Sequence, residues 1–190
     1  RRELRQHLKA ALQKTGKRIL VVRGGDVCGK SHTQQLISYL KDAVGGFQLA
    51  IVDLGELAKT LEPGKQPNPL HVAKWLALRM SLNFETPNFS LAQANPTDAQ
   101  WPAFNSQFCT ALEAELSKKP EVVWWIVIDR PRDMQMPPLV AELVKQFALK
   151  LNGSLSNARL VLLGYKEEFE KDLKPQVETE EVSRISQTDI

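Results

Sequence analysis

Several features that would point to a specialised environment are scarce or missing in these 190 residues. There are only two cysteines, Cys28 and Cys109, too few for a disulfide framework. No apolar run approaches the length of a membrane-spanning helix, and no signal-peptide pattern is present. The net charge is only +3 and the basic residues are scattered, so nothing demands nucleic acid or an anionic membrane as partner. We therefore expect a cytoplasmic protein with no membrane partner and no specific nucleic-acid partner.

What remains is the composition of an ordinary globular domain. Hydrophobic residues make up 43% of the chain and charged residues 25%, and the length suffices for one α/β domain with a substantial core. No internal repeat or second domain is visible, so residues 1–190 are expected to form a single domain. Because the sequence opens on Arg1-Arg2 without a methionine, we expect it to be a piece of a larger multidomain protein.

Apolar periodicity predicts an alternation of strands and helices. Strands are expected at residues 18–23, 47–54, 122–128, 159–163 and 181–185. Helices are expected at residues 2–13, 30–43 and 70–83, for about four turns after Trp101-Pro102, from Pro137-Pro138 to Leu151, and at 166–173. Residues 55–70 are expected to be a loop, and residues 84–100 a loop or a mobile insert. This order predicts a three-layer α/β/α sandwich with a mostly parallel five-stranded sheet.

One motif stands between the first expected strand and the helix after it. Residues Gly24–Ser31 read G-x-x-x-x-G-K-S, the pattern of the phosphate-binding loop of P-loop NTPases. In that loop, successive backbone N–H groups cradle the phosphates at the amino end of a helix. The residues expected to contact the nucleotide are Gly24, Gly25, Asp26, Val27, Cys28, Gly29, Lys30, Ser31 and His32. The motif predicts binding of ATP (or ADP), although the Asp26 carboxylate should weaken it unless it points to solvent or pairs with a cation.

A second group of expected site residues concerns magnesium. Asp129 directly follows the apolar run Val122–Ile128, which is typical of an aspartate that holds Mg²⁺ through water at the carboxyl end of a neighbouring strand. Lys30 supplies positive charge to the phosphates, and the Ser31 hydroxyl is a direct Mg²⁺ ligand. The sequence therefore predicts Ser31 and Asp129 as metal-binding residues.

The groups that usually drive hydrolysis are harder to find. Arg130 follows Asp129, where many ATPases carry an acidic residue, and no polar sensor residue stands at Gly164-Tyr165. Asp133 is a candidate base, although a solvated loop aspartate is the alternative. Arg130 and Arg132 are candidate charge stabilisers or ordinary loop arginines. The candidate catalytic residues are thus Lys30, Asp129 and Asp133, and turnover, if any, is expected to be slow ATP hydrolysis.

Together these segments resemble one class of P-loop protein. The helix expected at 2–13, the segments Arg18–Gly24 and Gly29–Ser31, the Val122–Asp129 strand and the segment Glu181–Ser186 are similar to the STAND class of AAA-related NTPases, which includes NB-ARC and NACHT modules. The resemblance implies a nucleotide-dependent switch in a multidomain signalling or defence protein. Its implied partners are the nucleotide, other domains of the same polypeptide, and further copies of itself on activation. Arg130 and Gly164-Tyr165 depart from the class, which favours a divergent, hydrolysis-poor member.

Two other functions stay open on the sequence. A small-molecule or nucleotide kinase could use the same core, with residues 55–70 or 84–100 as a flap over an acceptor pocket. A non-enzymatic assembly scaffold with a decayed nucleotide site is the other, although the presence of Gly29, Lys30, Ser31 and Asp129 counts against complete decay. A GTPase is disfavoured because no Asn-Lys-x-Asp motif follows the late strands.

Overall fold

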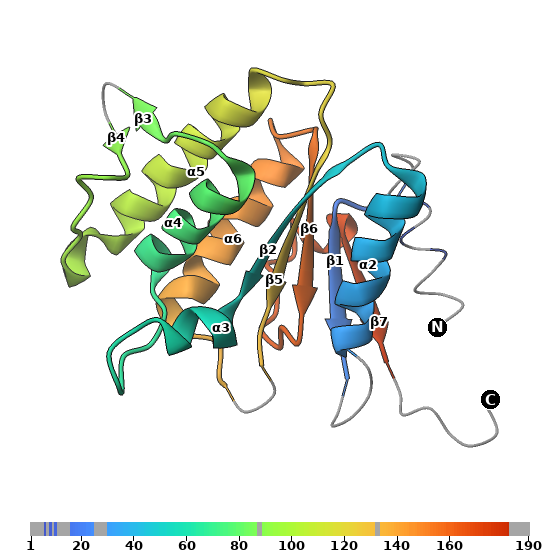
Figure 1. Ribbon diagram of the computed structural model, residues 1–190, viewed down its shortest axis with the longest axis horizontal. Helices are drawn as coiled ribbons and strands as arrows, with labels where there is room; N and C mark the ends of the chain where they lie inside the picture. Colours follow the sequence, from blue (N-terminus) through green and yellow to red (C-terminus); the bar gives the residue numbers. More distant parts are fainter. Residues whose placement is uncertain are drawn as a thin grey trace.

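The computed structural model describes residues 6, 8, 10, 16–24, 30–86, 89–131 and 134–182, which form one α/β unit (Figure 1). The strands of the main sheet are β1 (Ile19–Arg23), β2 (Gln48–Asp53), β5 (Trp124–Asp129), β6 (Ala158–Leu163) and β7 (Val177–Glu181). The α-helices whose bounds the structure describes are α2 (Lys30–Val44), α3 (Leu54–Lys59), α4 (Pro69–Met80), α5 (Trp101–Ser117) and α6 (Pro138–Asn152). Two-residue strands β3 (Glu85–Thr86) and β4 (Phe89–Ser90) form a separate hairpin. Short 3₁₀ helices occupy Asp98–Gln100 and Lys174–Gln176.

The main sheet is parallel throughout, with strand order β2-β5-β6-β1-β7. Its register places Asp53 beside Asp129, and Asp129 beside Leu163. Because all five strands run the same way, their carboxyl ends lie along a single edge, the lower edge in Figure 1. Ligands of open parallel sheets bind outside that edge.

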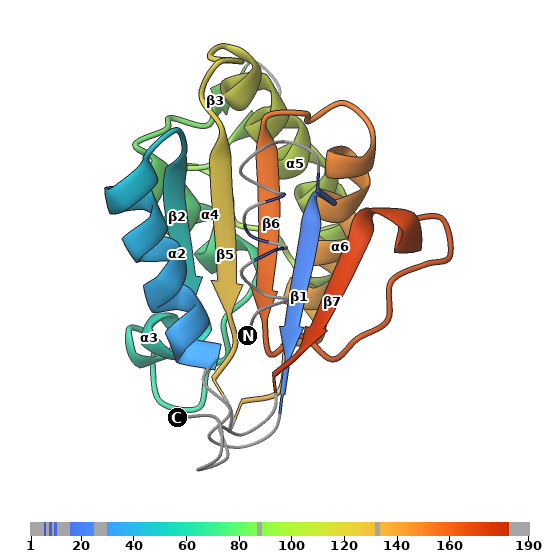
Figure 2. The same ribbon diagram turned by 90° about the vertical axis from the view of Figure 1, so that its right-hand side faces the viewer.

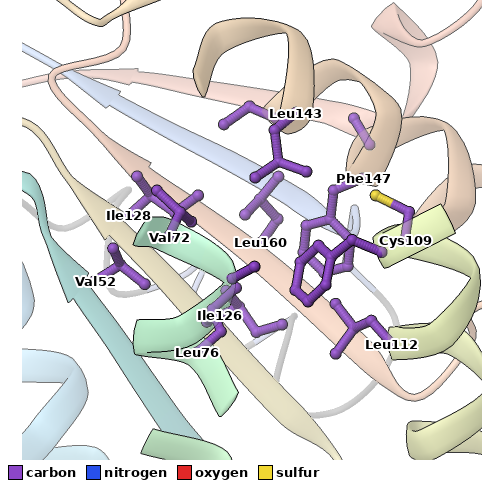
Figure 3. Packing of buried hydrophobic residues seen from close by; sticks show 14 of the residues in the cluster. Val52, Val72, Leu76, Cys109, Leu112, Ile126, Ile128, Leu143, Phe147 and Leu160 are labelled. Carbon is purple, nitrogen blue, oxygen red and sulfur yellow. The ribbon is translucent and has the colours of Figure 1, made fainter. Parts of the chain in front are cut away.

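Helices cover both faces of the sheet, so the predicted three-layer α/β/α sandwich is confirmed (Figures 1 and 2). Helices α4, α5 and α6 lie on one face, where Phe147, Leu112 and Leu160 belong to the larger core (Figure 3). Helix α2 lies on the other face, over a smaller core. Neighbouring residues of β5 divide between the two: Trp124 packs against the larger core and Trp125 lies in the smaller. One tryptophan ring therefore packs on each face of the sheet.

The helix expected at residues 2–13 is described only in part. Gln6, Leu8 and Ala10 are helical, and Leu8 is buried in the smaller core. Leu4 and Leu12 lie outside the described residues. In the part of the chain that the structure describes, no helix has both the length and the apolarity needed to cross a membrane.

The prediction of a loop at 55–70 is wrong at its start, because α3 occupies Leu54–Lys59. The carboxylate of Asp53 caps this helix: its Oδ1 accepts the backbone N–H of Gly55 at 2.8 Å and that of Glu56 at 3.0 Å. An aspartate followed three residues later by a glutamate is a known signature of a helix start. This signal was available in the sequence at Asp53–Glu56.

The described part of the stretch 84–100 is mostly loop, as one of the two expectations had it, and it is anchored in the larger core. Phe84, Phe89 and Leu91 are buried, at 1%, 8% and 5% exposure. Phe84 packs edge-on against Phe108 of α5, with ring centroids 5.2 Å apart. The β3–β4 hairpin therefore closes over α5 instead of extending into solvent.

Two expectations near the end of the chain are also wrong. Residues 166–170 are irregular and 171–173 form a turn, and the nearby helix is the 3₁₀ turn Lys174–Gln176. The last strand is Val177–Glu181 rather than 181–185, of which 183–185 lie outside the described residues. This strand is rich in glutamate, so it shows no apolar pattern in the sequence. An edge strand tolerates charged side chains, and pairing with β1 sets its register.

Candidate functional site

The predicted nucleotide-binding residues flank the carboxyl edge of the sheet. Gly24 directly follows β1, while Lys30, Ser31 and His32 form the first turn of α2. The strand–loop–helix context required by the phosphate-binding motif is therefore present. The motif residues Gly25, Asp26, Val27, Cys28 and Gly29, and the candidate base Asp133, lie outside the described residues.

The amino end of α2 suits an anion. The helix is fifteen residues long and has no acidic side chain in its first turn. Its first N–H groups have no partner within the helix, and the helix dipole adds partial positive charge there. His32 is exposed, whereas Thr33 is buried.

Asp129 is the last residue of β5 and is half-buried. It lies at the same sheet edge as the amino end of α2, but β6 separates β5 from β1. The expectation of a directly neighbouring strand is therefore wrong, and the two strands stand about two strand spacings, or ~10 Å, apart. A serine hydroxyl and a carboxylate are oxygen donors of the kind that Mg²⁺ prefers, and a carboxylate at this remove acts through bound water. The residue types at Ser31 and Asp129 thus fit the ion.

Arg130 has a structural role that the sequence did not reveal. It is only 5% exposed, so the alternative of an ordinary exposed loop arginine is wrong. Its Nε donates to the carbonyl oxygen of Gly164 at 2.7 Å, and its Nη1 donates to the carbonyl oxygen of Met134. The side chain therefore ties the segment after β5 to the segment after β6. The position after Asp129 therefore holds an arginine that clamps these two segments together, and not an acid.

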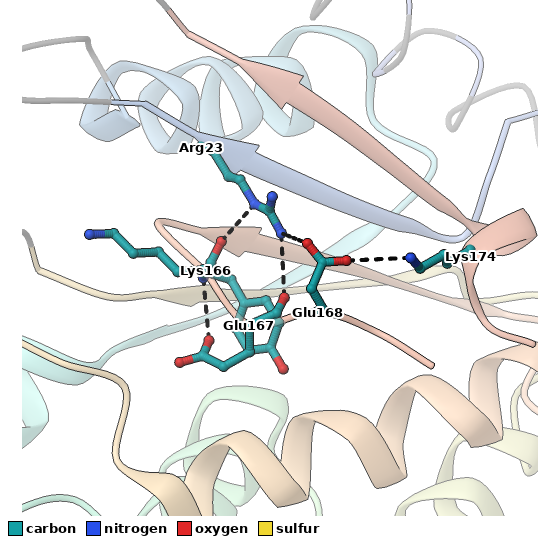
Figure 4. A network of polar contacts seen from close by, with 6 residues as sticks. Arg23, Lys166, Glu167, Glu168 and Lys174 are labelled. Carbon is teal, nitrogen blue, oxygen red and sulfur yellow. Dashed lines mark hydrogen bonds and ion pairs between the residues drawn. The ribbon is translucent and has the colours of Figure 1, made fainter. Parts of the chain in front are cut away.

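A second arginine holds the segment after β6 from the other side. Arg23, the last residue of β1, donates through Nε to the carbonyl oxygen of Tyr165 at 3.2 Å and through Nη2 to that of Glu167 at 3.4 Å (Figure 4). Glu168 pairs with Arg23 at 3.8 Å and with Lys174 at 3.5 Å. The carbonyl of Glu167 therefore accepts from an arginine instead of from a helical N–H, and no helix forms at residues 166–173.

Tyr165 packs as the sequence suggested. Its ring is fully buried and stacks on Phe169, with centroids 5.3 Å apart. Among the described residues the hydroxyl finds no hydrogen-bond partner, and burial raises the pKa of the phenol above its usual range. Tyr165 therefore contributes packing at the position where a polar sensor would stand.

We expect Tyr165→Phe to stabilise the fold by about 1 kcal/mol, because it removes a buried hydroxyl that no partner satisfies. Chemical denaturation measures this change in unfolding free energy. Tyr39→Phe is the matched control, since Tyr39 is 66% exposed and its change should stay within about 0.5 kcal/mol. A clear loss of stability in Tyr165→Phe would contradict the assignment of an unsatisfied hydroxyl.

His71 and Trp75, which share a face of α4, both have structural partners. His71 Nδ1 accepts the backbone N–H of Asn68, completing a capping box, and burial lowers the pKa of its imidazole. Trp75 Nε1 donates to the carbonyl oxygen of Ile51 at 3.2 Å and so covers the edge strand β2. These contacts give both residues structural roles, one at the start of a helix and one at the edge of the sheet.

A cavity of about 820 Å³ opens beside these elements, between α3 and the segment after β5. It is lined by Asp53, Gly55, Glu56, Lys59, Gln66, Pro131, Met134 and Gln135. Sequence reasoning marked Asp53 only as the end of a strand. Its place beside Asp129 follows from the pairing of β2 with β5, which the sequence order does not specify.

Solved structures share this fold. The chain is similar to Cdc6p from Pyrobaculum aerophilum (TM-score 0.59, 13% identity, 95% of this chain and 44% of that one). It is also similar to a Walker-type ATPase of Pyrococcus abyssi (0.57, 16%, 98% and 54%) and to a chain of the Drosophila ORC complex with AT-rich DNA and Cdc6 (0.54, 10%, 97% and 55%). The sequence matches no family model and no curated protein. The chain spans about half the length of these structures, and at such identities the likeness shows the fold alone, that of P-loop ATPases.

Proposed function

We propose that this chain is an ATP- and Mg²⁺-binding P-loop module. The observation that carries the proposal is the sequence G-x-x-x-x-G-K-S standing between an observed strand, β1, and the observed amino end of α2. Lys30 would neutralise phosphate charge, while Ser31 and Asp129 would hold the metal, directly and through water. Magnesium, when bound, neutralises charge on the phosphate oxygens.

We further propose that the module works as a switch with slow or absent hydrolysis. Arg130 is buried in a clamp at the position where an acid would activate water, and Tyr165 packs where a sensor would stand. Arg23 and Arg130 both hold the segment Gly164–Glu167, so this segment is joined to the ends of β1 and β5 at once. A rearrangement at the end of β1 or of β5 would therefore shift the segment Gly164–Glu167. These features favour a divergent STAND-like role in the cytoplasm, with other domains and further copies of the chain as partners.

The test of slow hydrolysis is phosphate release from ATP with Mg²⁺, followed over hours. The expected result is a bound nucleotide recovered largely as ATP, with turnover below about 0.01 s⁻¹, far under the usual range for enzymes. Release at 1 s⁻¹ or faster would contradict the switch.

A phosphotransferase is a second candidate, favoured by the cavity of about 820 Å³ beside Asp129. A cavity of this size accommodates a small acceptor. Phosphate transfer that requires an added acceptor, in the absence of ATP hydrolysis alone, would support this candidate over the switch.

A further inference from the structure

The cavity between α3 and the segment after β5 is built from fixed parts. Asp53 caps α3, whose Leu54 and Leu57 are buried in the larger core. Gly55 lies so close to Pro131 that a Cβ on it would stand 2.5 Å from the proline Cγ. Pro131 in turn follows the clamped Arg130. The walls therefore stand in place before any ligand arrives.

The charges around this cavity do not balance. Lys59 Nζ already pairs with Glu56 Oε1 at 2.7 Å. Asp53 uses Oδ1 for both of its backbone bonds, and within the described residues no basic side chain forms an ion pair with it. Among the lining residues that the structure describes, two carboxylates stand against one ammonium, so this part of the lining carries a net negative charge. The remaining lining combines the amides of Gln66 and Gln135 with the apolar surfaces of Pro131 and Met134.

We infer that this cavity is a second ligand site, for an alkylammonium group. The ammonium would pair with the Asp53 carboxylate, its methylene chain would pack on Pro131 and Met134, and the two glutamine amides would bond further polar atoms. A volume of about 820 Å³ lies in the range of small-molecule sites. The lining shares no residue with the phosphate-binding motif, although Asp53 pairs in register with Asp129, so we expect the site to bind its ligand without nucleotide.

The probe is n-butylammonium, titrated into the full chain without nucleotide and followed by NMR at the amides of Gly55 and Gln66. The neutral n-butanol, of the same chain length, is the ligand control. We expect saturable binding of the ammonium and at least about tenfold weaker binding of the alcohol. Equal binding of both, or no saturation, would overturn the inference.

The variant that tests the charge is Asp53→Asn. Asparagine caps a helix as well as aspartate does, so α3 should persist while the charge disappears. We expect at least about tenfold weaker binding of n-butylammonium. Glu62→Gln, an exposed acid outside the lining, is the matched control and should bind as the unaltered chain does. Unchanged binding in Asp53→Asn would overturn the inference.

Two further titrations are needed. The first distinguishes a small-molecule amine from a lysine side chain as the ligand, and the second distinguishes this site from the proposed nucleotide site. The methylamide of Nα-acetyl-lysine presents the same ammonium as a protein side chain would. If it binds as well as n-butylammonium, the site takes a lysine of a partner, whereas binding of the free amine alone indicates a small molecule. Lys30→Ala should abolish ATP binding yet keep the ammonium site. Loss of the ammonium site in Lys30→Ala would contradict its independence.

Discussion

Arg130→Glu is expected to lower the unfolding free energy by about 4 kcal/mol. The substitution breaks two charge-assisted hydrogen bonds, to the carbonyl oxygens of Gly164 and Met134, and places a carboxylate among acceptors. Because Arg130 is only 5% exposed, water cannot solvate the new charge without displacing the surrounding backbone. Chemical denaturation measures the loss. Lys171→Glu makes the same change of charge at an exposed position and should cost within about 0.5 kcal/mol.

The same variant addresses catalysis. It places an acidic residue after Asp129, where many ATPases have one. We nevertheless expect no faster phosphate release, because the side chain at position 130 faces the segment after β6. If the variant is too unstable to assay, Arg130→Gln keeps a donor and should lose about 2 kcal/mol. A stable Arg130→Glu protein that hydrolyses ATP faster would show that position 130 faces the nucleotide.

Phe108→Ala is the second large effect, expected to cost about 4 kcal/mol of unfolding free energy. Phe108 is 1% exposed and its ring meets those of Phe84, Phe89 and Phe104 at centroid distances of 5.2, 6.5 and 6.3 Å. Removing the ring leaves a cavity under the β3–β4 hairpin. The hairpin amides should then exchange faster, including that of Leu91, which donates to the Phe84 carbonyl oxygen.

Gln107→Ala is the control for this substitution, since Gln107 is exposed on the next position of the same helix. Its expected cost is within about 0.5 kcal/mol. Equal costs in the two variants, or hairpin amides that keep their protection in Phe108→Ala, would show that residues 84–91 are not held by this cluster.

Much of the fold could be predicted from apolar pattern alone. The runs Ile19–Val22, Val122–Ile128 and Arg159–Leu163 are covered on both faces in a parallel sheet, so they appear as continuous apolar segments. Helices α2, α4, α5 and α6 show apolar residues at helical spacing because one side of each helix packs against the sheet. The apolar pattern could not predict the order of the strands in the sheet, because a pairing such as that of β2 with β5 joins residues distant in the sequence.

The failures occur where tertiary contacts override local pattern. Residues 84–100 contain few apolar residues, but Phe84, Phe89 and Leu91 are enough to anchor them. Residues 166–173 have helix-forming glutamates and lysines, yet the carbonyl of Glu167, like that of the preceding Tyr165, accepts from Arg23. The role of Arg130 escaped notice because an arginine after a strand is usually solvated, and burial depends on the segment after β6.

The candidate site was only partly predictable. The motif Gly24–Ser31 and Asp129 fixed its place at one sheet edge, and the structure places β1, α2 and β5 accordingly. Asp53 gave only the signal of a helix cap, and Gly55 gave none, since its close approach to Pro131 depends on the tertiary structure.

The most direct test of nucleotide binding is a calorimetric titration of ATP with Mg²⁺ into the unaltered chain and into Lys30→Ala. In the proposed site the Lys30 ammonium would pair with phosphate oxygens, and partial desolvation of such a pair makes it worth several kcal/mol. We predict saturable one-to-one binding that Lys30→Ala weakens by at least about a hundredfold. No binding by the unaltered chain, or binding that Lys30→Ala leaves unchanged, would contradict the assignment of Gly24–Ser31 as a phosphate-binding loop.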